Sequence, residues 1–207
     1  MALCPCPAPN ELSDIPSATC KFDLGQIQKI GFQRVGYLWD TAGTPTSNMT
    51  LLADWNTLKS ASDDTKVVFT PLIGGEPLIT AGAEITEGGG DNTTLDGIPI
   101  ITGTNPSTFS AMFRSLTPEQ EAGLKSLMCE PQLVVYFVTN NNKIIAKKIT
   151  TAQKEGLSIN ALFVSDRTNE GYGKRDTHKI QFSLPAGWSE SIELITPATG
   201  FNPLTDL

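Results

Sequence analysis

Apolar and polar residues alternate along several short stretches of the chain. In residues 178–184 Ile180, Phe182 and Leu184 alternate with polar side chains, and residues 79–85 show a similar alternation. Successive side chains of a strand point to opposite faces, so this pattern predicts strands with one buried face. Further predicted strands cover residues 27–38, 67–70, 157–164 and 188–195. The chain is therefore expected to be mainly β.

Residues 133–138, with the sequence LVVYFV, are apolar at every position. A strand of this kind is typical of a sheet centre that is covered on both faces. The polar run at 139–143 predicts a turn, and residues 144–146 predict the returning strand. A hairpin with a doubly covered first strand is expected here.

Two helices are predicted. In residues 117–129, Thr117 suits the N-cap, Pro118 suits the first helical position, and Gln120 completes a capping box with Thr117. Residues 50–60 place their apolar side chains at helical spacing and predict a second, shorter helix.

A long hairpin is predicted over residues 78–102. Its first strand would place Ile79, Ala81, Ala83 and Ile85 on one face, and a glycine-rich tip follows at 87–92. Pro99 assigns the returning strand to a sheet edge. The apolar face would be covered either by the same subunit or by a neighbouring one.

The prolines of residues 1–20 and their lack of periodicity predict an extended N-terminal arm. Residues 21–207 are expected to form a single domain. Its predicted fold is a β-sandwich or barrel with one flanking helix at 117–129, a second short helix at 50–60 and the long hairpin.

Charged residues make up 18% of the sequence, and the net charge is −7. The few basic residues are scattered, which argues against a surface that grips phosphates. No apolar run is long enough for a membrane helix, and the N-terminus lacks the pattern of a signal peptide. We expect synthesis in a bacterial-type cytoplasm and no contact with membranes.

Candidate chemistry is sparse. Cys4, Cys6 and Cys20 lack the paired spacing of a zinc site, so free thiols are expected rather than a metal, and Cys129 is expected to be a small buried side chain. His178, the single histidine, lies in line with Ile180 and is interpreted as a partner of a neighbouring side chain rather than a general base. No nucleophile elbow occurs.

The loop with Asp91, Asn92 and Asp96 lacks the calcium-binding ligand pattern. A pair of carboxylates brought together only by the fold stays open as an alternative. We therefore predict no catalytic residues, no cofactor, no metal, no small-molecule substrate and no enzymatic activity.

Several segments share their sequence character with one family. They are CPCP at 4–7 with LSDIP at 12–16, QKIGFQR at 28–34, GGGDNTT at 88–94 and FNPLTDL at 201–207. Through them the chain resembles virion structural proteins of tailed bacteriophages of gut Bacteroidetes, the crAss-like phages, and in element order a tail-tube or head–tail ring subunit.

This resemblance implies a non-enzymatic subunit of the virion that forms a homo-oligomeric ring or tube and contacts other virion proteins. DNA would pass through the ring without specific binding, since an acidic wall repels it. The alternative is a carbohydrate- or protein-binding β-sandwich used for attachment. That function needs exposed aromatic side chains, and Trp39, Trp55 and Trp188 fit a core equally well.

Deletion of residues 1–20 is expected to leave the domain folded and to weaken contacts between subunits, because the arm has no core pattern of its own. Calorimetry and size-exclusion chromatography measure the two effects. Loss of the cooperative thermal transition in the truncated chain would place the arm in the core.

Overall fold

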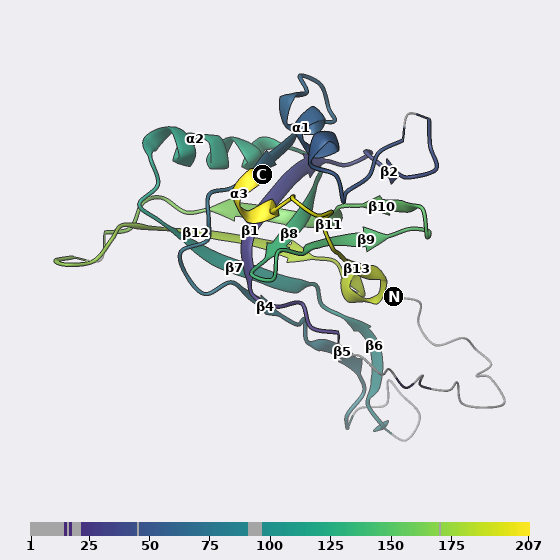
Figure 1. Cartoon of the computed structure of the whole chain (residues 1–207). Helices are drawn as coiled ribbons and strands as arrows, with labels where there is room; N and C mark the ends of the chain where they lie inside the picture. Colours follow the sequence, from purple (N-terminus) through teal and green to yellow (C-terminus); the bar gives the residue numbers. More distant parts are fainter. Residues whose placement is uncertain (1–14, 16, 18–21, 45, 91–96, 170) are drawn as a thin grey trace.

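The computed structural model describes residues 15, 17, 22–44, 46–90, 97–169 and 171–207 (Figure 1). The strands are β1 (Ile27–Arg34), β2 (Trp39–Asp40), β3 (Val67–Phe69), β4 (Leu78–Thr80), β5 (Glu84–Glu87), β6 (Ile100–Thr104), β7 (Ser107–Arg114), β8 (Leu133–Thr139), β9 (Ile144–Lys148), β10 (Gln153–Glu155), β11 (Leu157–Val164), β12 (Thr177–Leu184) and β13 (Ile192–Ile195). The helices are α1 (Leu52–Ser60), α2 (Pro118–Ser126) and α3 (Pro203–Asp206), with 3-10 turns η2 (Leu127–Cys129) and η3 (Trp188–Ser191). The mainly β prediction is confirmed, whereas most of the predicted arm lies outside the described residues.

Strand β8 lies at the centre of the fold. It pairs with β1 along its length, and its other edge pairs with β11 and then with β9. Every residue of β8 is buried. Leu133, Val135 and Phe137 belong to one hydrophobic core, and Val134, Tyr136 and Val138 belong to another. The predicted doubly covered strand and its hairpin with β9 are confirmed.

Strand β11 connects the two halves of the large sheet. Residues 157–159 pair with β8, whereas residues 160–164 pair with β12. The pairing with β12 contains a register shift between Asn160 and Phe163, where Ala161 has a φ of 54°. Beyond β12 the sheet continues through β7 to β4.

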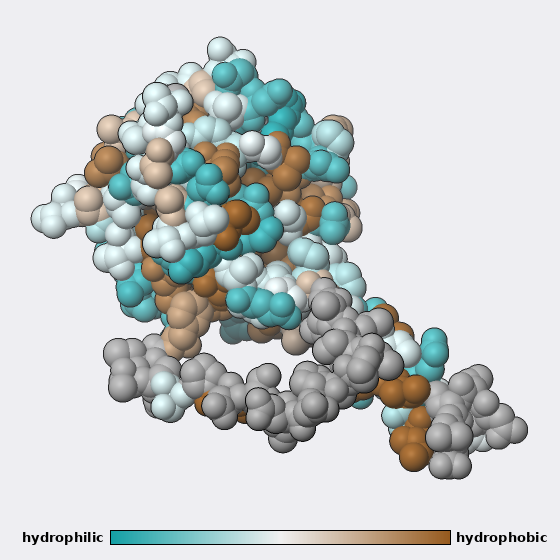
Figure 2. Space-filling view, turned by 90° about the vertical axis from the view of Figure 1, so that its right-hand side faces the viewer, coloured by the Kyte–Doolittle hydropathy of each residue, from teal (hydrophilic) through white to brown (hydrophobic). Residues whose placement is uncertain are grey.

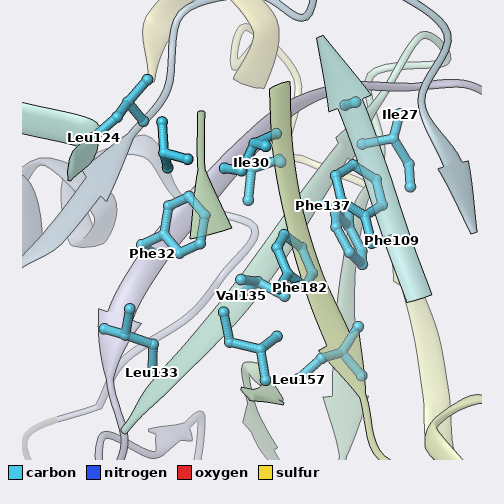
Figure 3. Close-up of a cluster of buried hydrophobic side chains, with 14 of the residues drawn as sticks. Ile27, Ile30, Phe32, Phe109, Leu124, Leu133, Val135, Phe137, Leu157 and Phe182 are labelled. Carbon is cyan, nitrogen blue, oxygen red and sulfur yellow. The ribbon is translucent and has the colours of Figure 1, made fainter. Parts of the chain in front are cut away.

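The two halves of the sheet enclose a common core (Figure 3). Phe182 of β12 meets Phe32 of β1 edge-on, with 6.2 Å between the ring centroids. The ring of Phe109 on β7 lies 5.2 Å from that of Phe137 on β8. These strands are not neighbours in the sheet, so the contacts cross from one half to the other. This packing agrees with the predicted β-sandwich type of fold.

The second core covers the opposite face of β8. There Trp55 of α1 packs on Trp39 of β2, with 4.4 Å between the ring centroids. The hydroxyl of Tyr136 accepts a hydrogen bond from Trp39 Nε1 at 3.0 Å and donates one to Gln33 Oε1 at 2.6 Å. Burial raises the pKa of Tyr136, which keeps this donor protonated. The chain of bonds fixes the outer layer to the central strand.

Both predicted helices are confirmed. In α2 the Thr117 hydroxyl accepts the backbone N–H of Gln120, and the Gln120 side chain accepts the backbone N–H of Thr117, so the predicted capping box is present. Leu124 of α2 is buried in the first core. The helix therefore flanks the sheet and continues into η2.

Several predicted elements differ from the structure. Strand β7 has no counterpart among the predicted strands, and β1 ends at Arg34 rather than continuing to residue 38. The last strand begins at Ile192, because Trp188 lies in η3, after Gly187 with its φ of 75°. The left-handed conformation at Gly187 breaks the strand that the apolar spacing predicts.

Tyr136→Phe is expected to destabilise the fold by about 1–3 kcal/mol, because it leaves Trp39 Nε1 and Gln33 Oε1 buried without their shared partner. Denaturant unfolding measures the change. Tyr172→Phe is the matched control, since Tyr172 is fully exposed. Equal stability of the two variants would contradict the role of the hydroxyl.

Candidate assembly surface

Strands β5 and β6 form a separate two-stranded hairpin that projects from the body (Figure 1). Glu84 pairs with Thr104 and Glu87 with Ile100, with a register shift between these pairs. The backbone N–H of Gly89 bonds to the carbonyl of Gly97 at 3.0 Å and extends the ladder towards the tip. We call residues 84–90 and 97–104 the projecting hairpin.

The hairpin is shorter than the predicted hairpin over residues 78–102. Its expected first part, β4, leaves the hairpin and pairs with β7 in the large sheet. Residues 81–83 are not in a strand, and Gly82 lies against the backbone at Asn105, where an added Cβ would come within 1.8 Å of the carbonyl oxygen. This close crossing separates β4 from β5. The prediction that one continuous strand places Ile79, Ala81, Ala83 and Ile85 on a single face is therefore wrong.

The projecting hairpin leaves large apolar side chains exposed. Exposed fractions are 44% for Ile85, 63% for Ile98, 56% for Ile100 and 61% for Ile101, and all four residues of β5 are exposed. Figure 2 shows brown, apolar surface on this projection at the lower right. A cluster of uncovered isoleucines on one projection is typical of a contact site for another protein.

The strand pairing of the hairpin is limited to its own two strands in the part of the chain that the structure describes. Within the described residues, β5 pairs with β6 and with no further strand, and β6 likewise pairs with β5. An isolated two-stranded hairpin is marginally stable in water, and an open edge offers N–H and C=O groups to an additional strand. Both features favour a partner on this hairpin.

A polar cluster lies at the far end of β7 and β12. The fully buried His178 places Nε2 2.9 Å from Glu121 Oε2 on α2. The Glu121 carboxylate also accepts a hydrogen bond from Lys125 at 2.8 Å and forms an ion pair with Arg167 at 3.3 Å. Arg167 in turn pairs with Asp176. The cluster connects α2 to the end of the sheet.

Sequence reasoning missed this constellation, because its members lie on separate elements. The alternation of β12 does place His178 on the buried face with Ile180. His178 has no accessible surface, and its Nδ1 has no hydrogen-bond partner among the described residues. A buried imidazole cannot reach a dissolved substrate. The geometry therefore supports a role in which His178 holds α2 in position on the sheet.

The three tryptophans do not form an exposed binding platform. Trp39 and Trp55 are buried, and the partly buried Trp188 bonds to Ser107 Oγ. Cys129 is exposed, which corrects its expected burial; the other predicted cysteine positions, 4, 6 and 20, lie outside the described residues.

Two further observations concern the described part of the chain. No group of three or more His, Cys, Asp or Glu side chains there is arranged to hold a metal ion. None of its helices has the length and apolar character needed to cross a membrane. The loop with Asp91, Asn92 and Asp96, which lacks the calcium-binding pattern in the sequence, lies outside the described residues.

A cavity of ≈ 470 Å³ lies between β3 and α2. Its lining includes Val68, Phe69, Leu124 and Leu127 and contains no acidic or basic side chain. Such a hollow can hold an apolar group but offers no general acid or base.

Comparison with known proteins assigns no family. No family model and no curated protein matches the sequence. Two solved structures show a partial likeness, each with 7% identity, a TM-score of 0.35 and 60% coverage of this chain. One is a chain of the tail of an empty GTA particle with C6 symmetry, covered to 85%, and the other comes from the virion of a native gene transfer agent particle, covered to 88%. At these values the likeness does not establish a shared fold or function.

Glu121 is expected to make stability depend on acid pH. Hydrogen bonds from Lys125 and then His178 lower the pKa of Glu121 from its ordinary 4.5 to about 2. The stabilisation is thus present above pH 4.5 and is lost as the pH falls towards 2. Glu121→Gln should lower stability at pH 7 and flatten this acid-side loss, as measured by urea unfolding across pH.

Glu76→Gln serves as the control, because Glu76 is exposed and makes no hydrogen bond or ion pair within the described residues. An acid-side slope that is the same in Glu121→Gln and the unmodified chain would contradict the assignment.

Proposed function

We propose that this chain is a non-enzymatic structural subunit of a phage-type particle and that it assembles with further copies of itself. The observation that carries the proposal is the projecting hairpin, with its exposed isoleucines and a strand pairing that, within the described residues, is limited to its own two strands. Exposure of these apolar side chains to water does not stabilise an isolated subunit. A neighbouring subunit that covers them would contribute roughly half of the 1.5–3 kcal/mol of a fully exposed side chain for each isoleucine, because each is already about half buried.

The hairpin suits an interface because it is anchored at both ends. Strand β4 precedes it and β7 follows it, and both belong to the large sheet. The Asn105 N–H bonds to the carbonyl of Ala83 at 2.9 Å across its base. An anchored projection loses less conformational freedom on binding than a loose loop, so more of the burial energy remains for assembly.

We further propose a ring or tube of the tail or head–tail connector as the assembled form, in line with the sequence resemblance. The net charge of −7 supports a channel through which DNA passes without adhesion. The N-terminal arm at residues 1–20 would add contacts to neighbouring subunits or other virion proteins. The buried tryptophans argue against the alternative of a carbohydrate-binding module.

The double substitution Ile85→Asp with Ile101→Asp is expected to abolish assembly and to leave a folded monomer. Both side chains are exposed in the subunit, so the charges are tolerated there but not in a buried interface. Size-exclusion chromatography with light scattering measures assembly, and circular dichroism measures folding.

Val35→Asp with Ile149→Asp is the matched control, because these residues are exposed apolar side chains elsewhere on the body. Assembly of the hairpin variant at the concentration at which the unmodified chain assembles would overturn the proposed interface. An unfolded hairpin variant would instead show that the hairpin belongs to the core of the subunit.

A further inference from the structure

The charges of the chain are unevenly distributed around the projecting hairpin. No lysine or arginine occurs between Lys66 and Arg114, whereas Glu84 and Glu87 lie on β5 itself. Both glutamates are exposed and form no ion pair within the described residues. The hairpin is therefore an apolar projection with an uncompensated negative charge.

The opposite charge gathers at the far end of β7 and β12. Strands β4, β7, β11 and β12 contain no acidic residue. Met112, Arg114 and Lys179 are exposed, and the register pairs Lys179 with Met112 directly. Paired residues share a face of the sheet, so these side chains lie on its outer face.

The loop before β12 adds to this basic end. A hollow of ≈ 470 Å³ there is lined by Met112, Arg114, Gly173, Lys174, Arg175 and Thr177. Arg114, Arg175 and Lys179 form no ion pair with any described residue, whereas the nearby Asp176 is engaged by Arg167 and Asn169. We call Arg114, Lys174, Arg175 and Lys179 the basic end.

The hairpin and the basic end cannot meet within one subunit. Strand β7 begins at Ser107 beside the hairpin and ends at Arg114, about 23 Å away at strand spacing. Figure 1 shows the hairpin and the loop before β12 projecting at different ends of the molecule. A contact between these two surfaces therefore requires a second copy.

We propose that the projecting hairpin of one copy docks on the basic end of the next copy. Glu84 and Glu87 would face Arg114 and Lys179, and the exposed isoleucines would cover Met112. Two different surfaces make this contact, so it is head-to-tail and generates a closed ring or an open filament rather than a two-fold dimer. This inference rests on the proposed function and names the acceptor surface.

Charge complementarity favours the projecting hairpin, rather than a nucleic acid, as the partner that binds the basic end. The basic end is a small group beside an exposed methionine, in a chain of net charge −7. Binding of a phosphate backbone draws on a larger run of positive charge. The hairpin supplies both the acids and the apolar side chains that this surface matches.

The test uses charge reversal in the full-length chain. The acceptor variant carries Arg114→Glu and Lys179→Glu, and the hairpin variant carries Glu84→Lys and Glu87→Lys. Each alone should weaken assembly about tenfold or more, because exposed attractive pairs become repulsive. Mixing the two variants, or combining all four changes in one chain, should restore assembly, because opposite charges face each other again.

Lys66→Glu with Lys143→Glu is the matched control, since it changes the net charge equally at a different site. Sedimentation velocity measures assembly, and a labelled DNA duplex in the same samples measures nucleic-acid binding. If the acceptor variant and the hairpin variant each assemble on their own, or if their mixture does not assemble, the acceptor assignment is overturned and the proposed function stays intact. If the acceptor variant loses DNA binding but still assembles, the basic end binds nucleic acid, and the acceptor assignment is again overturned. A monomeric unmodified chain overturns both proposals.

Discussion

The burial of β8 on both faces is the constraint on which the rest of the structure depends. Its alternating side chains enter two separate cores, so each face of the strand needs its own covering layer. The half of the sheet around β12 and β7 covers one face, and α1 with Trp39 and the segment around α3 covers the other. The bonds of Tyr136 to Trp39 and Gln33 then fix the outer layer in position.

Much of this fold can be predicted from the sequence, because the strongest patterns are local. The uniform apolar run at 133–138, the alternation in β12 and the capping box at Thr117 all predict the elements observed. Strand β7 carries an equal alternation in Phe109, Ala111 and Phe113, but Ser107, Thr108 and Ser110 around them also suit a loop. The pairing of the strands, including that of β4 with β7, depends on contacts between residues that are far apart in the sequence.

The candidate surface is predictable to a lesser degree. The glycine-rich tip and the returning edge strand indicate a hairpin, and Gly88 to Gly90 do adopt positive φ. The exposure of Ile85 and Ile101 cannot be read from the sequence, because the same alternation also fits a covered strand. The partnership of His178 with Glu121 likewise requires the fold, since α2 and β12 are far apart in the chain. The candidate contact surface is thus identified by the apolar side chains that the described residues leave exposed.

Electron microscopy of the purified chain in negative stain tests directly whether the chain assembles with copies of itself. At increasing protein concentration and moderate ionic strength we expect rings or tubes of repeating subunits, because a neighbouring copy would cover the projecting hairpin. A field of separate single subunits under every condition, with light scattering that also reports a monomer, would contradict it.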